Sequence, residues 1–159
     1  MKKLFLFSVI VLIGFCWFHY NGYYFSCLSN SLPIGIYQRS NKVPGLGDYA
    51  AFRLDPVINK YAQARGYIKS DVWLMKKVYA VPGDVVERRD RKIFINGKVV
   101  EGLSIEQVDS KGRRLDLFYS ERLVLGQGQY WMMSDYNPRS WDSRYFGVVE
   151  VDFVMQKIF

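Results

Sequence analysis

The chain has very few of the residues that most hydrolases use as catalytic bases or metal ligands. Its 159 residues include one histidine, His19, and two cysteines, Cys16 and Cys27. Because His19 directly follows an apolar run, a Ser/His/Asp triad, a Cys/His dyad and a histidine-ligated zinc site are excluded for the rest of the chain. Beyond the first 30 residues there is also no thiol for a disulfide, a metal site or a nucleophile. If the chain is a hydrolase, its base must be a carboxylate or a lysine, and we expect no cofactor.

The charge balance is basic, but no nucleic-acid-binding motif accompanies it. The 22 Lys and Arg residues exceed the 15 Asp and Glu residues, which gives a net charge of +7. A basic balance is the electrostatic footprint of nucleic-acid binding. It also suits a surface that faces an anionic membrane or is simply solvated. Because the chain has no helix-turn-helix, RNP-like or zinc-module pattern, we expect no nucleic-acid partner.

Residues 1–25 are typical of an N-terminal membrane anchor. Lys2 and Lys3 precede a stretch, Leu4 to Gln38, that contains no charged residue and begins with fifteen mostly apolar residues. The aromatic residues that follow can form an interfacial belt, so we expect one transmembrane helix of about 20 residues in contact with the lipid bilayer. The positive-inside rule then places residues 26–159 outside the cytoplasm. A cleaved signal peptide is the alternative, although bulky aromatics follow Phe18 where a small-x-small cleavage site would be needed.

Residues 26–159 are expected to form one mainly β domain. Segments rich in Val, Ile, Tyr, Phe and Trp alternate with Gly, Pro, Asn or Asp, which indicates short strands joined by turns. The predicted strands are Asp48–Leu54, Val72–Val81, Asp84–Arg88, Lys92–Val100, Arg113–Tyr119, Tyr130–Ser134 and Phe146–Met155.

Local patterns add detail to this domain. Asn96-Gly97 between apolar β-formers predicts a two-residue type I′ hairpin. One helix is predicted after Asp55 as the N-cap, with Pro56 at its first position and Gly66 as its C-terminal stop. The polar segment Gly102–Lys111 is expected to be an excursion from the sheet.

A first segment with catalytic potential runs from Ser29 to Tyr37, with the sequence Ser-Asn-Ser-Leu-Pro-Ile-Gly-Ile-Tyr. Pro33 and Gly35 argue against a helix, and an extended chain places Ser29 and Ser31 on one face because side chains alternate with a period of two. A nucleophile here would meet substrates just as they emerge from the bilayer. The alternative is an extended leader with solvated serines.

A second segment, Val72 to Asp84, contains two adjacent lysines. On a strand, Lys76 shares its face with aliphatic residues, whereas Lys77 shares the other face with aromatic residues and a methionine. Desolvation lowers the pKa of a lysine, and a fall from about 10.4 to about 8 requires about 3 kcal/mol of lost charge stabilisation. A neutral amine can take a proton from a serine. The alternative, an edge-strand lysine that deters aggregation, suits Lys77 better.

A third segment, Met132 to Gly147, places a hydroxyl, a carboxylate and a guanidinium in one loop. Asp142 and Arg144 are spaced to form an ion pair that stiffens the loop, which leaves Ser140 free to hydrogen-bond inward. A structural turn with a solvated ion pair is the alternative.

In this order behind an N-terminal anchor, the three segments resemble the type I signal peptidase superfamily, and most closely its conjugative-transfer branch of TraF-type pilin-processing peptidases. The spacing Ser-x-Ser-x-Pro-x-Gly-x-Tyr from Ser29 is the branch marker, whereas general signal peptidases carry Ser-Met-x-Pro. Lys76-Lys77-Val78 is similar to the lysine box of the family, with Lys77 where Arg is usual. Ser140-Trp141-Asp142-Ser143-Arg144-Tyr145-Phe146-Gly147 is similar to its C-terminal box.

The resemblance implies a signal-peptidase-like, mainly β domain with one N-terminal transmembrane helix, and it implies roles for individual residues. Ser31 would be the nucleophile and Lys76 the general base. The Ser31 N–H and the Ser29 hydroxyl would form the oxyanion hole. Ser140 would orient the Lys76 amine, with support from a second group of residues, Asp142 and Arg144, which would brace that loop.

The resulting hypothesis is a serine endopeptidase of the bacterial inner membrane, facing the periplasm, that cleaves leader peptides from exported precursors. Its substrates would be pilin-like subunits of a conjugation system. The alternatives are a general signal peptidase of broad range, a cytosolic self-cleaving repressor with the same chemistry, and a catalytically silent, membrane-tethered domain that binds pilus subunits.

Overall fold

The computed structural model describes residues 2–20, 24–27, 31–70 and 72–157, and the elements named below lie within these ranges. The helices are α1 (Lys2–Tyr20), α2 (Pro56–Arg65) and α3 (Ser143–Phe146). The strands are β1 (Tyr24–Cys27), β2 (Gly35–Ser40), β3 (Tyr49–Phe52), β4 (Leu74–Ala80), β5 (Val85–Arg89), β6 (Lys92–Ile95), β7 (Lys98–Ser104), β8 (Arg122–Val124), β9 (Gln129–Met133), β10 (Val149–Glu150) and β11 (Phe153–Lys157). The prediction of a mainly β fold is confirmed.

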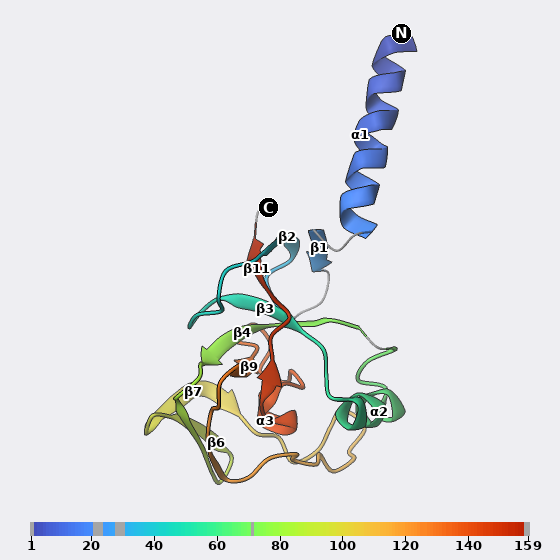
Figure 1. Cartoon of the computed structure of the whole chain (residues 1–159). Helices are drawn as coiled ribbons and strands as arrows, with labels where there is room; N and C mark the ends of the chain where they lie inside the picture. The colour runs from blue at the N-terminus through green and yellow to red at the C-terminus, as the bar shows by residue number, and fades with distance from the viewer. Residues whose placement is uncertain (1, 21–23, 28–30, 71, 158–159) are drawn as a thin grey trace.

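Two antiparallel sheets form the body of the protein (Figure 1). The larger sheet has the strand order β1-β2-β11-β3-β4-β9-β10, and the smaller sheet has the order β7-β6-β5-β8. One buried cluster joins α2 to β3, β4 and β9, and a second joins β4 and β9 to β5 and β6. Strand β4 therefore lies inside the larger sheet and is held by core packing along its length, which matters because β4 carries Lys76.

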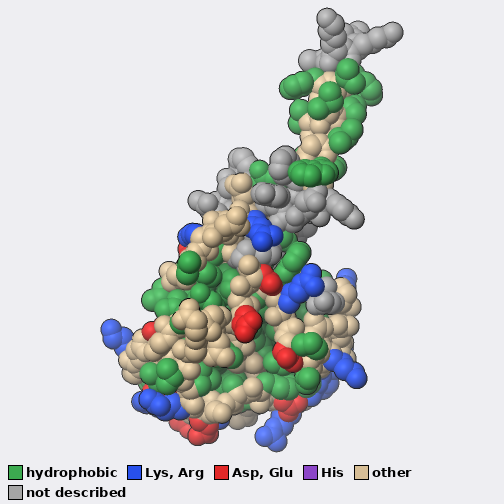
Figure 2. All heavy atoms as spheres, viewed as in Figure 1, with side chains coloured by type: hydrophobic (Ala, Val, Ile, Leu, Met, Phe, Trp, Pro, Cys, Tyr) green, Lys and Arg blue, Asp and Glu red, His purple; other side chains and the backbone are tan. Residues whose placement is uncertain are grey.

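Helix α1 extends away from the sheets (Figure 1), and apolar side chains cover much of the face that Figure 2 shows. Large exposed side chains occur all around it: Phe5, Leu6, Phe7, Ile10, Val11, Leu12, Ile13, Phe15 and Trp17. Within the described ranges, no helix combines the length and the apolar character needed to cross a membrane. The predicted N-terminal helix is present, whereas its predicted transmembrane span is not confirmed.

The strongest local predictions are confirmed. The Asp55 carboxylate accepts a hydrogen bond from the Val57 N–H at 2.8 Å at the start of α2, and Gly66 ends this helix in the left-handed conformation. Asn96 and Gly97 have φ angles of +50° and +78° between β6 and β7. Positive φ at both central residues is what a type I′ turn requires.

One predicted strand is wrong, and another is confirmed only in part, by β10 and β11. The segment Arg113–Tyr119 forms only one isolated bridge, between Arg114 and Val108. Individual side-chain contacts hold it instead, such as the bond from the Arg113 guanidinium to Asp109 at 2.7 Å. The predicted strand Phe146–Met155 is interrupted because Phe146 ends α3 and the next residue, a glycine, has a φ angle of +84°.

Other differences concern short elements. Strand β7 continues to Ser104, so the excursion predicted for Gly102–Lys111 begins three residues later than predicted, at Ile105. Strand β1 pairs with β2 and therefore runs through the predicted domain boundary between residues 25 and 26, which stays a prediction. The sequence pattern did not indicate β1, β8 or α3, because three or four residues are too few for a periodic signal.

Candidate active site

Lys76 is buried in the interior of the larger sheet. Along β4 the side chains at positions 76, 78 and 80 are buried, whereas those at 75, 77 and 79 are partly exposed. Lys76 itself is 4% exposed, and it lies opposite Ala50 of β3. The predicted alternation is thus confirmed. The alternative of an edge-strand lysine is wrong, because β3 and β9 flank β4 on its two sides.

Ser31 lies in a turn directly before β2, next to the Lys76 amine. The predicted extended conformation begins only at Gly35, so the expectation of one extended face from Ser29 to Tyr37 is wrong for Ser31. Ser29 lies outside the described residues. The Lys76 Nζ donates a hydrogen bond to the Ser31 Oγ at 2.6 Å across 45 residues of sequence. The structure therefore brings together the two residues predicted to be nucleophile and base.

A small apolar cluster packs against this turn. Leu32 is fully buried and packs with Cys27, Tyr37 and Ala51. The Tyr37 hydroxyl donates a hydrogen bond to the Pro33 carbonyl at 2.6 Å. The buried leucine fixes the turn against the sheet, and the serine before it stays partly exposed.

Burial lowers the pKa of Lys76 from 10.5 to about 8. Desolvation is the largest cause, because an ammonium ion loses its hydration in the interior. The nearby Arg144 guanidinium acts in the same direction, whereas Asp142 and Cys27 raise the pKa. An amine with a pKa of about 8 is neutral in about a tenth of the molecules at pH 7 and in half of them at pH 8, and a neutral amine accepts protons.

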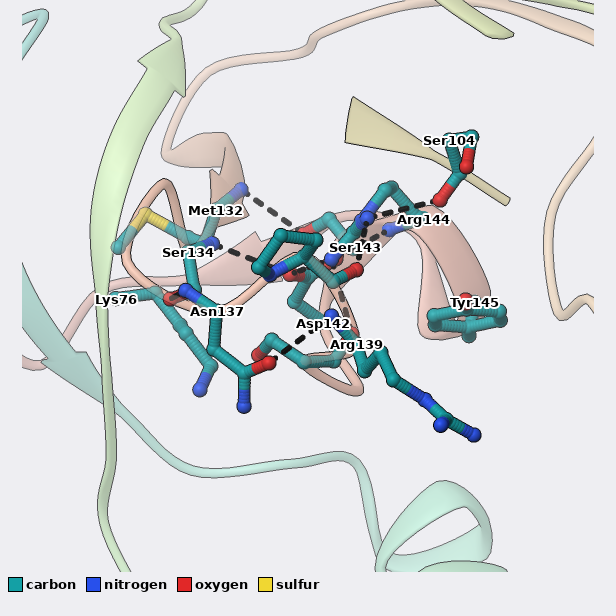
Figure 3. A network of polar contacts seen from close by, with 12 residues as sticks. Lys76, Ser104, Met132, Ser134, Asn137, Arg139, Asp142, Ser143, Arg144 and Tyr145 are labelled. Carbon is teal, nitrogen blue, oxygen red and sulfur yellow. Dashed lines mark hydrogen bonds and ion pairs between the residues drawn. The ribbon is translucent and has the colours of Figure 1, made fainter. Parts of the chain in front are cut away.

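The predicted ion pair between Asp142 and Arg144 is present and buried (Figure 3). Arg144 Nε and Nη2 donate to the two Asp142 carboxylate oxygens at 2.8 and 2.9 Å, and both side chains are 0% exposed. Its other N–H groups reach the carbonyls of Ser104, Pro138 and Ser140 at 2.8 to 3.0 Å. A buried pair is stable only when its remaining donors are satisfied in this way. The alternative of a solvated pair is wrong, and the pair braces the loop.

The expected contact between the Ser140 hydroxyl and the Lys76 amine is not seen among the described residues. Its Oγ is buried and has no hydrogen-bond partner among the described residues, while its carbonyl accepts from Arg144. In this structure the Lys76 amine bonds to Ser31 instead. The role of Ser140 in orienting Lys76 therefore stays a prediction.

Ser134 is a contact residue that the sequence did not reveal. Its hydroxyl donates to the Ser31 carbonyl at 2.7 Å and accepts from the Asn137 N–H at 3.1 Å. Its own N–H donates to the Asp142 carboxylate at 3.1 Å. The available signal was a Ser-Asp-Tyr-Asn run at the end of an apolar strand, because small polar residues there bind neighbouring backbone.

We found no metal site that competes with this pair in the described part of the chain. Among the described residues, no group of three His, Cys, Asp or Glu side chains is placed to hold a metal ion. Residues of the same loop, Arg139 and Trp141, line a cavity of about 170 Å³, and both carboxylates that line it are paired with arginines. We therefore place the candidate site at Ser31 and Lys76.

The depressed pKa predicts that Lys76 lowers the stability of the fold. The folded chain holds this proton less tightly than the unfolded chain, so the cost is complete below pH 8 and disappears as the pH rises to 10.5. Lys76→Met should therefore raise the free energy of unfolding at pH 7 by up to about 3 kcal/mol. The gain should shrink between pH 8 and 10.5 in urea titrations. Lys77→Met, on the exposed face, should show no such gain, and equal behaviour of the two variants would contradict the prediction.

Comparisons with known proteins identify the family of the chain. The family model described as signal peptidase, peptidase S26, matches residues 1–159. Two Escherichia coli proteins, both named plasmid transfer protein TraF, are 33% and 30% identical over 129 residues, which is 76% of this chain and 72% of each relative. The solved structure of a signal peptidase I from Enterococcus faecalis V583 is 28% identical and covers 72% of this chain and 98% of its own, with a TM-score of 0.43. The chain therefore belongs to the signal peptidase S26 family, in the TraF-type branch of the type I signal peptidase superfamily.

Proposed function

We propose that the chain is a serine endopeptidase that cleaves leader peptides with a Ser31/Lys76 dyad. Membership of the S26 family supports peptide cleavage by a serine nucleophile. The observation that carries the assignment of residues is the 2.6 Å contact between the Ser31 Oγ and a buried amine. An activated nucleophile needs a base within hydrogen-bond reach, and this pair meets that requirement.

The proposed reaction uses the amine twice. Neutral Lys76 takes the proton of the Ser31 hydroxyl while Oγ attacks the carbonyl carbon of the scissile peptide bond. The resulting ammonium gives this proton to the leaving amine, the peptide C–N bond breaks, and an ester to Ser31 remains. Lys76 then takes a proton from water, whose oxygen attacks the carbonyl carbon of the ester. The bond from this carbon to Ser31 Oγ breaks, Oγ takes the proton back from Lys76, and the cleaved chain leaves with a new carboxyl group.

The oxyanion formed during attack needs preorganised donors. We assign this task to the Ser31 N–H and the Ser29 hydroxyl, as the family resemblance implies. The Ser31 N–H suits the task because it belongs to the same residue as the attacking oxygen and therefore stays close to it. A donor of this kind contributes about 3 kcal/mol to lowering the barrier, so loss of the Ser29 hydroxyl should slow the enzyme without abolishing its activity.

The proposed substrates are exported precursors of a conjugation system, and pilin-like subunits above all. The two TraF relatives are named plasmid transfer proteins, and they align with three quarters of this chain. The Ser-Leu-Pro spacing after Ser31 also differs from the Ser-Met-x-Pro of general signal peptidases. A general signal peptidase of broad range is the second candidate, since the matching family model covers signal peptidases as a whole.

We further propose that α1 holds the enzyme in the bacterial inner membrane, with the catalytic domain in the periplasm. The large exposed side chains of α1 are apolar, and exposed apolar side chains favour an apolar environment. The chain should therefore stay in the membrane pellet after a carbonate wash and leave it only with detergent. A chain that a salt wash releases would contradict this anchoring.

Ser31→Ala and Lys76→Ala should each give a folded protein with no measurable cleavage of a pilin precursor. The first loses the nucleophile and the second loses the base. A penem that acylates serine should label the wild-type chain once, at Ser31, as measured by intact mass. Lys77→Ala is the matched control, because Lys77 forms an exposed pair with Asp135 at 2.7 Å on the opposite face of β4. If Lys76→Ala cleaved the precursor at the wild-type rate, the dyad would be wrong.

The pH dependence of kcat/KM should report the Lys76 amine. Only the neutral amine accepts the serine proton, so activity should rise as the pH passes through about 8 and then level off. The measurement is the initial rate of precursor cleavage at low substrate concentration from pH 6 to 10. A rate that is constant across this range would exclude a lysine base with this pKa.

A further inference from the structure

Side chains from other parts of the chain hold the turn that carries Ser31 by contacting its backbone carbonyl groups. Three successive carbonyls, at residues 31, 32 and 33, each lie near a side chain from a different element. Ser134 after β9 donates to the first at 2.7 Å, Cys27 of β1 lies 4.0 Å from the second, and Tyr37 of β2 donates to the third at 2.6 Å. The first contact joins residues 103 positions apart in the sequence. It connects the turn to the loop of the Asp142–Arg144 pair.

The geometry of Ser134 leaves its hydroxyl little freedom. Its side chain is 0% exposed, and it accepts from the Asn137 N–H, so the hydroxyl proton must point to the remaining acceptor, the Ser31 carbonyl. The Ser134 N–H is bonded to the Asp142 carboxylate, which Arg144 holds in turn. Ser134 is therefore a rigid link between a braced loop and the backbone of the nucleophile.

The same pair of strands also places the base. Lys77, the neighbour of Lys76 on β4, pairs with Met133 on β9, and Ser134 is the next residue after Met133. The amine of Lys76 and the carbonyl of Ser31 are thus both positioned from the β4–β9 pair. Fixing the Ser31 peptide plane fixes where its Cβ and hydroxyl lie relative to that amine.

We propose that Ser134 is a positioning residue for catalysis: its bond to the Ser31 carbonyl holds the nucleophile on the Lys76 amine. This inference rests on the proposed Ser31/Lys76 dyad. Ser134 does not touch the reacting atoms. It acts through the backbone, so its loss should lower the rate of acylation and leave substrate affinity nearly unchanged.

The test compares full-length wild type and Ser134→Ala in detergent. The rate of Ser31 acylation by a penem is measured by intact mass, and kcat and KM are measured with a pilin precursor. We expect acylation and kcat to fall about tenfold, as for loss of one buried hydrogen bond, with KM changed less than about twofold. The midpoint of the pH profile should not move, because Ser134 makes no bond to the amine. Ser134→Thr, which keeps the hydroxyl, should recover most of the rate.

Ser143→Ala is the matched control for a loss of stability. Its hydroxyl is equally buried and accepts one backbone hydrogen bond, from Met132 at 2.9 Å, without a contact to the Ser31 turn. If Ser143→Ala slowed acylation as much as Ser134→Ala, or if Ser134→Ala reacted at the wild-type rate, the positioning role would be overturned while the dyad stood. If the wild-type chain were neither acylated nor active, or if Ser31→Ala were acylated as fast as the wild type, the proposed function would fail. The positioning role of Ser134 would then fail with it.

Discussion

The site depends on the burial of one amine. An ammonium ion at position 76 is costly because the sheet interior cannot hydrate it, and this cost lowers its pKa to about 8. The sheet tolerates the cost because the rest of β4 is packed by two buried clusters. The reactivity proposed for Ser31 is therefore a consequence of core packing: the aliphatic neighbours that stabilise the fold also make the lysine a base.

A second buried charge pair organises the other side of the site. Asp142 and Arg144 would each be costly alone, and together they are stable because Arg144 also reaches three backbone carbonyls. Asp142 uses its remaining capacity to bind the N–H of Ser134 and thereby the loop that touches the Ser31 turn. The ion pair thus acts as a structural brace, and its carboxylate also moderates the pKa of Lys76.

Sequence reasoning succeeded where the signal was local. The alternation on β4 predicted which of two adjacent lysines is buried, and Asp55, Gly66 and Asn96-Gly97 predicted a helix and a hairpin through their own backbone preferences. Sequence reasoning failed to predict contacts between segments that are far apart in the sequence, because the topology of the sheets decides which segments meet. The bond from Ser134 to Ser31 and the unpartnered hydroxyl of Ser140 depend on segments brought together by sheet order. The segment Arg113–Tyr119 has the composition of a strand, but no sheet edge receives it.

The two adjacent lysines of β4 have one further consequence. Because side chains alternate, sliding this strand by one position against β3 and β9 would present the amine of residue 77 to the serine and turn that of residue 76 outward. Such a shift would also drive Tyr79 into the space now filled by Val78. The small aliphatic residues that follow Lys76 therefore decide which of the two amines faces Ser31, and mutations that enlarge or shrink them would act on the proposed chemistry by changing the alignment of β4.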